Sequence, residues 1–166
     1  GHAQSVAWDA LDRVTSAVDA VGNARQMEYD TADRLVRSTS TERNAATGAT
    51  ETFRSMFAYD NLNRLTTTIN NVGHARSFAH DSRNNVVLAS DANVGSGTQG
   101  NTVRSRFDGL GRQTRMGQDL REGGVGSGAV THEIVTATTW DDDGRMVSVE
   151  DDNHAITQYA HDALGR

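Results

Sequence analysis

Apolar residues in this chain recur at every second position in short stretches that polar turns separate. In five stretches an apolar residue stands two positions ahead of an aromatic or histidine residue: Val6, Met27, Phe57, Phe78 and Tyr159. Even spacing returns after three of the turns, in the pairs Val14 and Val18, Leu65 and Ile69, and Val86 and Leu88. A two-residue period places side chains on one face of a pleated strand. We therefore expect antiparallel strands with one apolar, half-buried face, and an opposite face of Thr, Ser, Arg and Gln that meets water.

One motif marks the turns and recurs seven times. Its copies are WDALDRV, YDTADRL, YDNLNRL, HDSRNNV, FDGLGRQ, WDDDGRM and HDALGR. Position one is aromatic or His, at Trp8, Tyr29, Tyr59, His80, Phe107, Trp140 and His161. Position two is always Asp, at Asp9, Asp30, Asp60, Asp81, Asp108, Asp141 and Asp162. Position six is Arg in six copies, at Arg13, Arg34, Arg64, Arg112, Arg145 and Arg166, and Asn85 in the fourth.

Position five of the motif indicates the turn type. It holds Asp12, Asp33, Asn63, Asn84, Gly111, Gly144 and Gly165. Asp, Asn and Gly are the residues that best tolerate a positive φ, and a hairpin with a type I turn followed by a left-handed residue needs one at this place. Asp at the start of such a turn accepts backbone N–H bonds. The motif therefore predicts a β-hairpin in which Asp and Arg face each other and fix the register.

The spacing of the motif predicts a serpentine array. Successive motif Asp residues lie 21, 30, 21, 27, 33 and 21 residues apart. The shortest spacing fits two strands, the hairpin turn and a second, looser turn, seen in DAVGN, NNVGH and DDNHA. The extra residues fall in TERNAATGATE, NVGSGTQGN and REGGVGSGAV, which we interpret as loop extensions. About 14 strands result, more than an open twisted sheet usually holds, so we expect the sheet to curl and cover its apolar face.

Composition narrows the function classes. The chain has 16 basic residues, all Arg, against 22 acidic ones, and this net charge of −6 argues against a nucleic-acid partner. Cys is absent, so disulfides and thiolate metal sites are excluded. No stretch is long and apolar enough for a membrane span, and the first residues lack the features of a signal peptide.

The motif resembles the RHS or YD repeat, and its copies run from Trp8 to Arg166. That resemblance implies an all-β spiral sheet that forms part of a hollow shell in a large secreted or cell-surface bacterial protein. In toxin members of the family such a shell holds a C-terminal toxin, and carbohydrate binding has been proposed for other members. The Asp-Pro core segment where many such proteins cleave themselves is absent, because the chain has no Pro. Residues 1–166 are thus interpreted as one repeat array, and its end within a hairpin predicts a fragment of a longer chain.

Possible chemical sites have simpler structural explanations. The acidic run at Asp141–Asp143, with Glu150 and two further Asp residues nearby, lacks the ligand spacing of a calcium loop. His80 and His161 occupy the aromatic position of the motif, so we interpret them as substitutes for Tyr rather than as metal ligands with His74 or His154. The Asp–Arg pair recurs in six of the seven copies, and we interpret it as a rule of the fold because catalytic groups are usually singular. We therefore predict no catalytic residue, cofactor or metal.

Two functions remain. The first is a structural module that encloses or displays another segment of its own polypeptide. The second is an adhesion or carbohydrate-binding module, in which exposed aromatic residues would stack on sugar rings. Expected partners are other parts of the same polypeptide, with glycans or a second copy joined at open sheet edges as alternatives.

Overall fold

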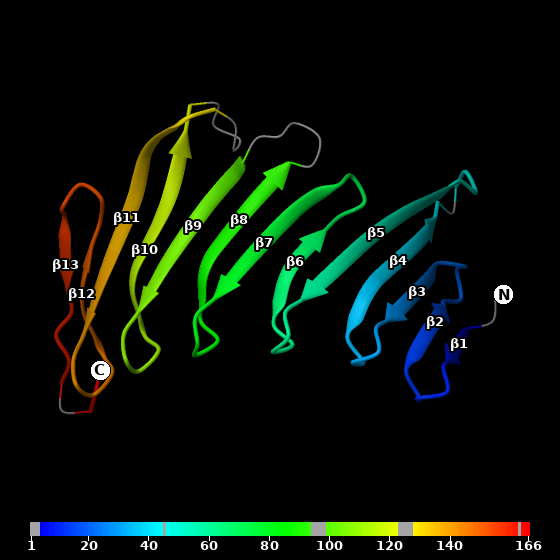
Figure 1. The fold of residues 1–166 in the computed structure, drawn as a ribbon, viewed down its shortest axis with the longest axis horizontal. Coiled ribbons are helices and arrows are strands. Elements are labelled where there is room, and N and C mark those ends of the chain that lie inside the picture. The colour runs from blue at the N-terminus through cyan, green and yellow to red at the C-terminus, as the bar shows by residue number, and fades with distance from the viewer. Residues whose placement is uncertain (1–3, 45, 94–98, 123–127, 163) are drawn as a thin grey trace. The chain divides into compact units, whose positions relative to one another are not determined.

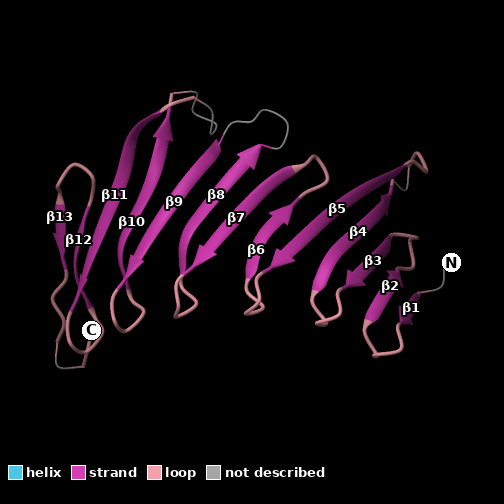
Figure 2. Ribbon diagram, in the orientation of Figure 1, coloured by secondary structure: helices cyan, strands magenta, loops and turns pink. Residues whose placement is uncertain are grey.

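The computed structural model describes residues 4–44, 46–93, 99–122, 128–162 and 164–166, and all regular structure in these ranges is β-strand (Figure 2). The prediction of an all-β, serpentine antiparallel fold is confirmed. The strands described are β1 Ser5–Trp8, β2 Val14–Val18, β3 Ala24–Tyr29, β4 Leu35–Arg43, β5 Thr50–Tyr59, β6 Leu65–Ile69, β7 His74–His80, β8 Val86–Asn93, β9 Gln99–Phe107, β10 Gln113–Arg121, β11 Val130–Trp140, β12 Met146–Glu150 and β13 Ile156–Gln158. β1 to β6 follow one another in sequence order without a crossover, and so do β8 to β13 (Figure 1).

The chain divides into two compact units, Gly1–Ala75 and Arg76–Arg166. In the first, each strand from β1 to β6 pairs antiparallel with the next. In the second, the same holds from β8 to β13. Every contact described below lies within one unit. None of the described residues forms a helix that is long and apolar enough to cross a membrane.

In the strand pairs that the structure describes, a β-bulge follows five of the motif turns. In the first hairpin Trp8 pairs with Val14, whereas the preceding residue Ala7 pairs with Ser16, so Thr15 is the extra residue. The same shift recurs beside Tyr29, Tyr59, Phe107 and Trp140. A bulge interrupts the hydrogen-bond ladder and increases the local twist of the strand.

The bulge corrects one prediction from the sequence. Val14 pairs with Trp8, but Val18 pairs with Ser5, which lies on the face opposite to Trp8. The extra residue shifts the alternation by one, and such a shift moves every later side chain to the other face. Leu65 and Ile69 are separated in the same way, because they pair with Tyr59 and Met56, which lie on opposite faces. Even spacing across the bulge therefore does not indicate a shared face.

The predicted loop extensions are partly strand. Within TERNAATGATE, residues 41–43 belong to β4 and residues 50–51 to β5. Arg121 and Val130 likewise extend β10 and β11 into REGGVGSGAV, and residues 99–101 of NVGSGTQGN belong to β9. Polar β-branched residues such as Thr tolerate an exposed strand well, which explains the longer hairpins. The parts of these predictions that concern residues 45, 94–98 and 123–127 lie outside the described residues.

The described residues contain no buried hydrophobic side chain, and the buried polar side chains are those of Ser38, Thr102 and Asp119. The expectation that Ser and Thr meet water is therefore wrong at Ser38, which pairs with Met27 on the same face as the motif aromatic residues.

We call the side of each unit that carries the motif aromatic residues the aromatic face. It carries Val6, Phe53 and Phe57 in the first unit and Met116, Leu120 and Ile134 in the second, as the pairings show.

Candidate functional site

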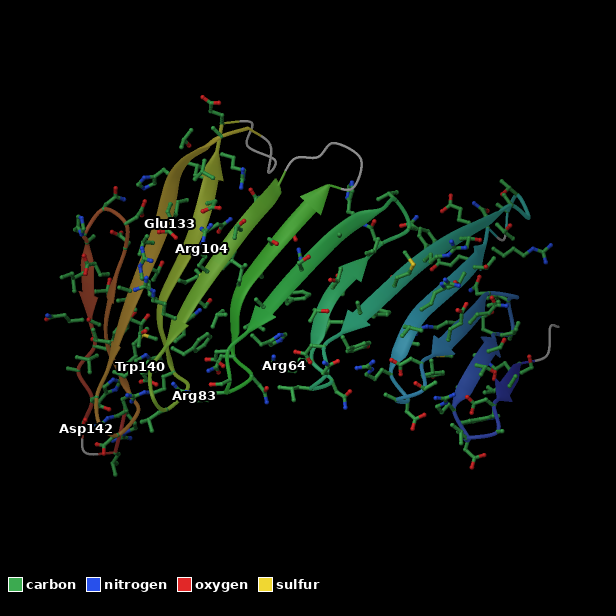
Figure 3. All side chains as sticks on the ribbon, viewed as in Figure 1. Arg64, Arg83, Arg104, Glu133, Trp140 and Asp142 are labelled. Atoms are coloured by element: carbon green, nitrogen blue, oxygen red, sulfur yellow. The ribbon has the colours of Figure 1, made fainter. Side chains whose placement is uncertain are left out.

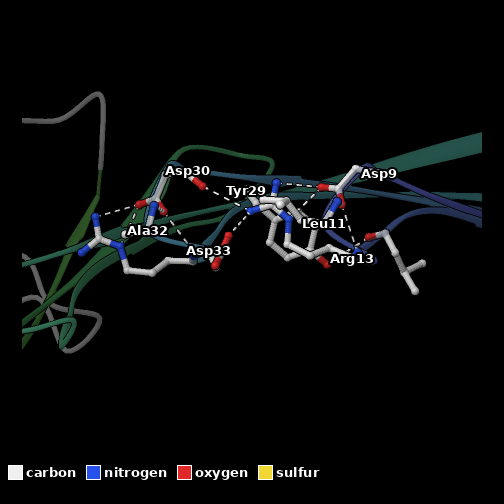
Figure 4. Close-up of polar contacts among 9 residues, drawn as sticks. Asp9, Leu11, Arg13, Tyr29, Asp30, Ala32 and Asp33 are labelled. Atoms are coloured by element: carbon white, nitrogen blue, oxygen red, sulfur yellow. Dashed lines mark hydrogen bonds and ion pairs between the residues drawn. The ribbon is translucent and has the colours of Figure 1, made fainter.

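The motif turn is closed by the carboxylate at position two. In the first copy Oδ1 of Asp9 accepts the backbone N–H groups of Leu11 at 2.9 Å and Arg13 at 3.0 Å (Figure 4). Oδ2 accepts the guanidinium Nε of Arg13 at 2.7 Å. The backbone N–H of Asp9 in turn donates to the carbonyl of Arg13 at 2.9 Å. One Asp side chain thus satisfies two backbone donors that would otherwise lack partners and orients the Arg that follows.

Position five has the left-handed conformation in all seven copies. Its φ is between 58° and 82°, at Asp12, Asp33, Asn63, Asn84, Gly111, Gly144 and Gly165. This agrees with the turn type expected from the choice of Asp, Asn and Gly at this position.

The second class of turn is not looser, as the sequence suggested, but has the same design. In DAVGN, Oδ1 of Asp19 accepts the N–H groups of Val21 and Asn23 at 2.9 Å each, and Gly22 has φ +92°. Asn23 takes the place of the Arg, because its Nδ2 donates to Oδ2 of Asp19 at 2.8 Å. NNVGH and DDNHA share the same closure by Asn70 and Asp151. These three turns therefore have the same five-residue design as the motif turns.

Three motif Arg residues also reach the next motif turn along the sheet. Arg13 donates from Nη1 to Oδ1 of Asp33 at 2.6 Å and lies over the ring of Tyr29, 4.7 Å from its centroid. Arg34 donates to the carbonyl of Asp60 at 3.0 Å and to Oδ1 of Asn63 at 3.1 Å. Sequence reasoning paired Arg only with the Asp of its own turn, because a contact across 20 or more residues leaves no local signal.

Arg34 and Arg112 repeat the stacking on the following aromatic ring. Their guanidinium groups lie 5.1 Å from the Tyr59 centroid and 5.8 Å from the Trp140 centroid, within the range of a cation–π contact. Arg112 also donates to the carbonyl of Asp141 at 2.7 Å. We call these contacts between successive motif turns the turn ladder.

The aromatic residue completes the turn ladder from the other side. Tyr29 donates from its hydroxyl to the carbonyl of Val14, and Tyr59 to that of Leu35, both at 2.9 Å. Trp140 donates from Nε1 to the carbonyl of Gln113 at 2.9 Å, and Nε2 of His161 lies 2.8 Å from the carbonyl of Met146. Each of these carbonyls belongs to position seven, where the bulge interrupts the backbone ladder. Position one therefore favours a ring with a polar tip, which explains why His can replace Tyr or Trp.

The turn geometry lowers the pKa of the position-two carboxyls below their ordinary value. For Asp9, Asp30 and Asp81 the main cause is a side-chain hydrogen bond, from Arg13, Arg34 and Asn85 respectively. In four other turns the main cause of the lowered pKa is the backbone N–H of the position-six residue, and this group comprises Asp60, Asp108, Asp141 and Asp162. A donor that binds the carboxylate favours the ionised form.

The acidic and histidine residues that were considered as metal ligands do not converge. Asp141 binds Arg145 at 2.7 Å, and Arg145 also binds Asp143 at 2.7 Å. His154 pairs with Glu150 at 2.7 Å, a contact that raises the pKa of His154. Among the described residues no three His, Asp or Glu side chains are grouped as a metal site.

A protein-family model matches the part of the chain that contains the first two copies of the motif. The model of the RHS Repeat family matches residues 8–50, which span the first two motif copies. No curated protein sequence matches the chain.

One solved structure shares the fold at low sequence identity, and two others have lower TM-scores. A crystal structure of TcdB2-TccC3-TEV is 11% identical, with a TM-score of 0.53, over 98% of this chain and 10% of that chain. A crystal structure of TcdB2-TccC3-Cdc42 has 11% identity and a TM-score of 0.39, over 98% and 12%. A porin-like protein from Bacteroides uniformis ATCC 8492 has 10% identity and a TM-score of 0.43, over 89% and 52%. The chain thus spans about a tenth of the two TcdB2-TccC3 structures. Residues 8–50 therefore match the RHS Repeat family, and the left-handed turn of these two copies recurs in the five later copies of the motif.

Proposed function

We propose that this chain is a non-catalytic wall segment of a β-shell that encloses or displays another segment of the same polypeptide, such as a toxin. We further propose that the parent polypeptide is a secreted or cell-surface bacterial protein. The match to the RHS Repeat family and the fold similarity to TcdB2-TccC3-TEV support this proposal. The turn ladder supports it too, because its polar side chains connect successive repeats and do not gather in one site.

The uncovered aromatic face carries the proposal. In the first unit Val6 and Phe53 are 54% and 42% exposed, and in the second Met116, Leu120 and Ile134 are 39%, 46% and 42% exposed. Apolar surface of this kind is stabilised when another apolar surface removes it from water. A polypeptide segment held against the aromatic face would provide that cover.

Site-specific photo-crosslinking in the complete polypeptide tests the proposal. A photoreactive phenylalanine analogue replaces Phe53 or Ile134 on the aromatic face, and in matched controls it replaces Arg54 or Val135, each one position along the same strand. Neighbouring residues of a strand point to opposite faces. We expect Phe53 and Ile134 to give crosslinks to a segment outside the repeats, identified by peptide mass spectrometry, and the controls to give few. Equal crosslinking from both faces, or none from the aromatic face, would contradict enclosure.

A further inference from the structure

The fourth motif copy departs from the other six in a way that the structure compensates. Its sequence is HDSRNNV, so position six is Asn85 and the Arg stands at position four, as Arg83. In the first, second and fifth copies the position-six Arg closes its own turn and also reaches the following one. In the fourth copy no single side chain at position six can both close its own turn and reach the following turn as an Arg does.

Asn85 performs the first task. Its backbone N–H donates to Oδ1 of Asp81 at 2.9 Å, and its Nδ2 donates to Oδ2 of Asp81 at 2.9 Å. These are the two contacts that Arg13 makes with Asp9. The side chain of Asn85 is uncharged and is shorter than Arg, so it does not extend beyond its own turn as Arg13 does.

Arg83 performs the second task. Arg83 is labelled in Figure 3. Its Nη1 donates to the carbonyl of Asp108 at 2.8 Å, across 25 residues. That carbonyl belongs to position two of the fifth copy, and it is the equivalent of the Asp141 carbonyl that Arg112 binds at 2.7 Å. A position-four Arg therefore reaches the acceptor that a position-six Arg reaches elsewhere.

The junction between the fourth and fifth copies cannot use two of the other contacts of the turn ladder. Phe107 has no polar tip to bind a position-seven carbonyl, and Gly111 has no side-chain acceptor at position five. Oδ1 of Asn85 lies 3.8 Å from where a Cβ of Gly111 would stand, so the position-six side chain still faces the following turn. The hydrogen bond from Arg83 therefore contributes a larger share of the contacts between these two turns than a single Arg contact does at other junctions.

We propose that Arg83 is the positioning residue of the fifth turn, in place of the Arg that the fourth copy lacks. The assignment concerns how repeats are joined and holds whatever the array encloses.

Amide hydrogen exchange in the turn Asp108–Arg112 tests the assignment in the 166-residue chain. We expect Arg83→Gln to accelerate exchange there by about two- to fivefold, the range of an exposed charge-assisted contact, while the turn at residues 141–145 keeps its rate. The second variant Arg83→Gln/Asn85→Arg, which returns the Arg to position six, should restore the rate. Arg106→Gln removes an exposed Arg from the fifth copy's first strand and should leave the turn unchanged.

A merely general loss of stability would accelerate both turns equally and would not be reversed by Asn85→Arg. Equal acceleration, no acceleration, or failure of the Asn85→Arg rescue would each overturn the assignment of Arg83.

Discussion

Acidification below pH about 4 is expected to unfold the array over a narrow pH range, with uptake of several protons per chain. The pKa of the position-two carboxyls is lowered in the folded chain, chiefly by side-chain donors at Asp9, Asp30 and Asp81 and by backbone N–H groups at four others. An unfolded Asp has a pKa of about 3.9. The folded state thus binds fewer protons, and its stability is complete above that value and is lost as the pH falls through the folded pKa values.

Thermal unfolding followed by circular dichroism from pH 7 to pH 2.5 measures this effect. Asp60→Asn is the matched variant, because Asn70 closes a turn of the same design with its amide oxygen. The variant should keep the fold and show a shallower loss of stability with acid, since one titrating carboxyl is removed. A melting temperature that stays level down to pH 2.5, or an Asp60→Asn profile that overlays the parent profile, would contradict the role of the carboxylates.

Gly111→Val is expected to destabilise the chain by about 1–2 kcal/mol, the cost of placing a side chain with a Cβ in the left-handed region. Gly111 has φ +78°, and the nearest atom to an added Cβ is 3.8 Å away, so the strain is conformational rather than steric crowding. Urea unfolding gives the free energy difference.

Two controls separate the turn conformation from general damage. Gly111→Asn should cost much less, because Asn63 occupies the same position of another copy with φ +62°. Gly109→Ala, two residues earlier, meets no atom within 4 Å and should be close to neutral. If Val and Asn at position 111 cost the same, the left-handed turn is not what selects this residue.

Local chemistry made the hairpins predictable from the sequence. Asp at position two and a residue tolerant of positive φ at position five are requirements of one short turn, so each copy carries its own signal. The second class of turn was not fully recognised because Asn23 stands in the place of Arg in one turn and His154 in the place of Gly in another.

Other features depended on contacts between distant repeats. The bulge at Thr15 leaves no mark in a two-residue period, and it reversed the face predicted for Val18 and Ile69. The stacking of Arg13 on Tyr29 and the substitution of Arg83 for a missing Arg become visible only when the strands are placed side by side. The low exposure of Ser38 follows from packing between neighbouring strands, which composition does not report.

The turn ladder is the central claim, and a double-mutant cycle across its shortest side-chain contact tests it most directly. Arg13→Gln and Asp33→Asn remove the 2.6 Å ion pair between successive turns, and Asn preserves the left-handed residue at position five. The unfolding free energies of the parent, both single variants and the double variant give the coupling. We predict a favourable coupling at low ionic strength that weakens as salt is added. Strictly additive effects at low salt would show that successive turns are not joined through these side chains.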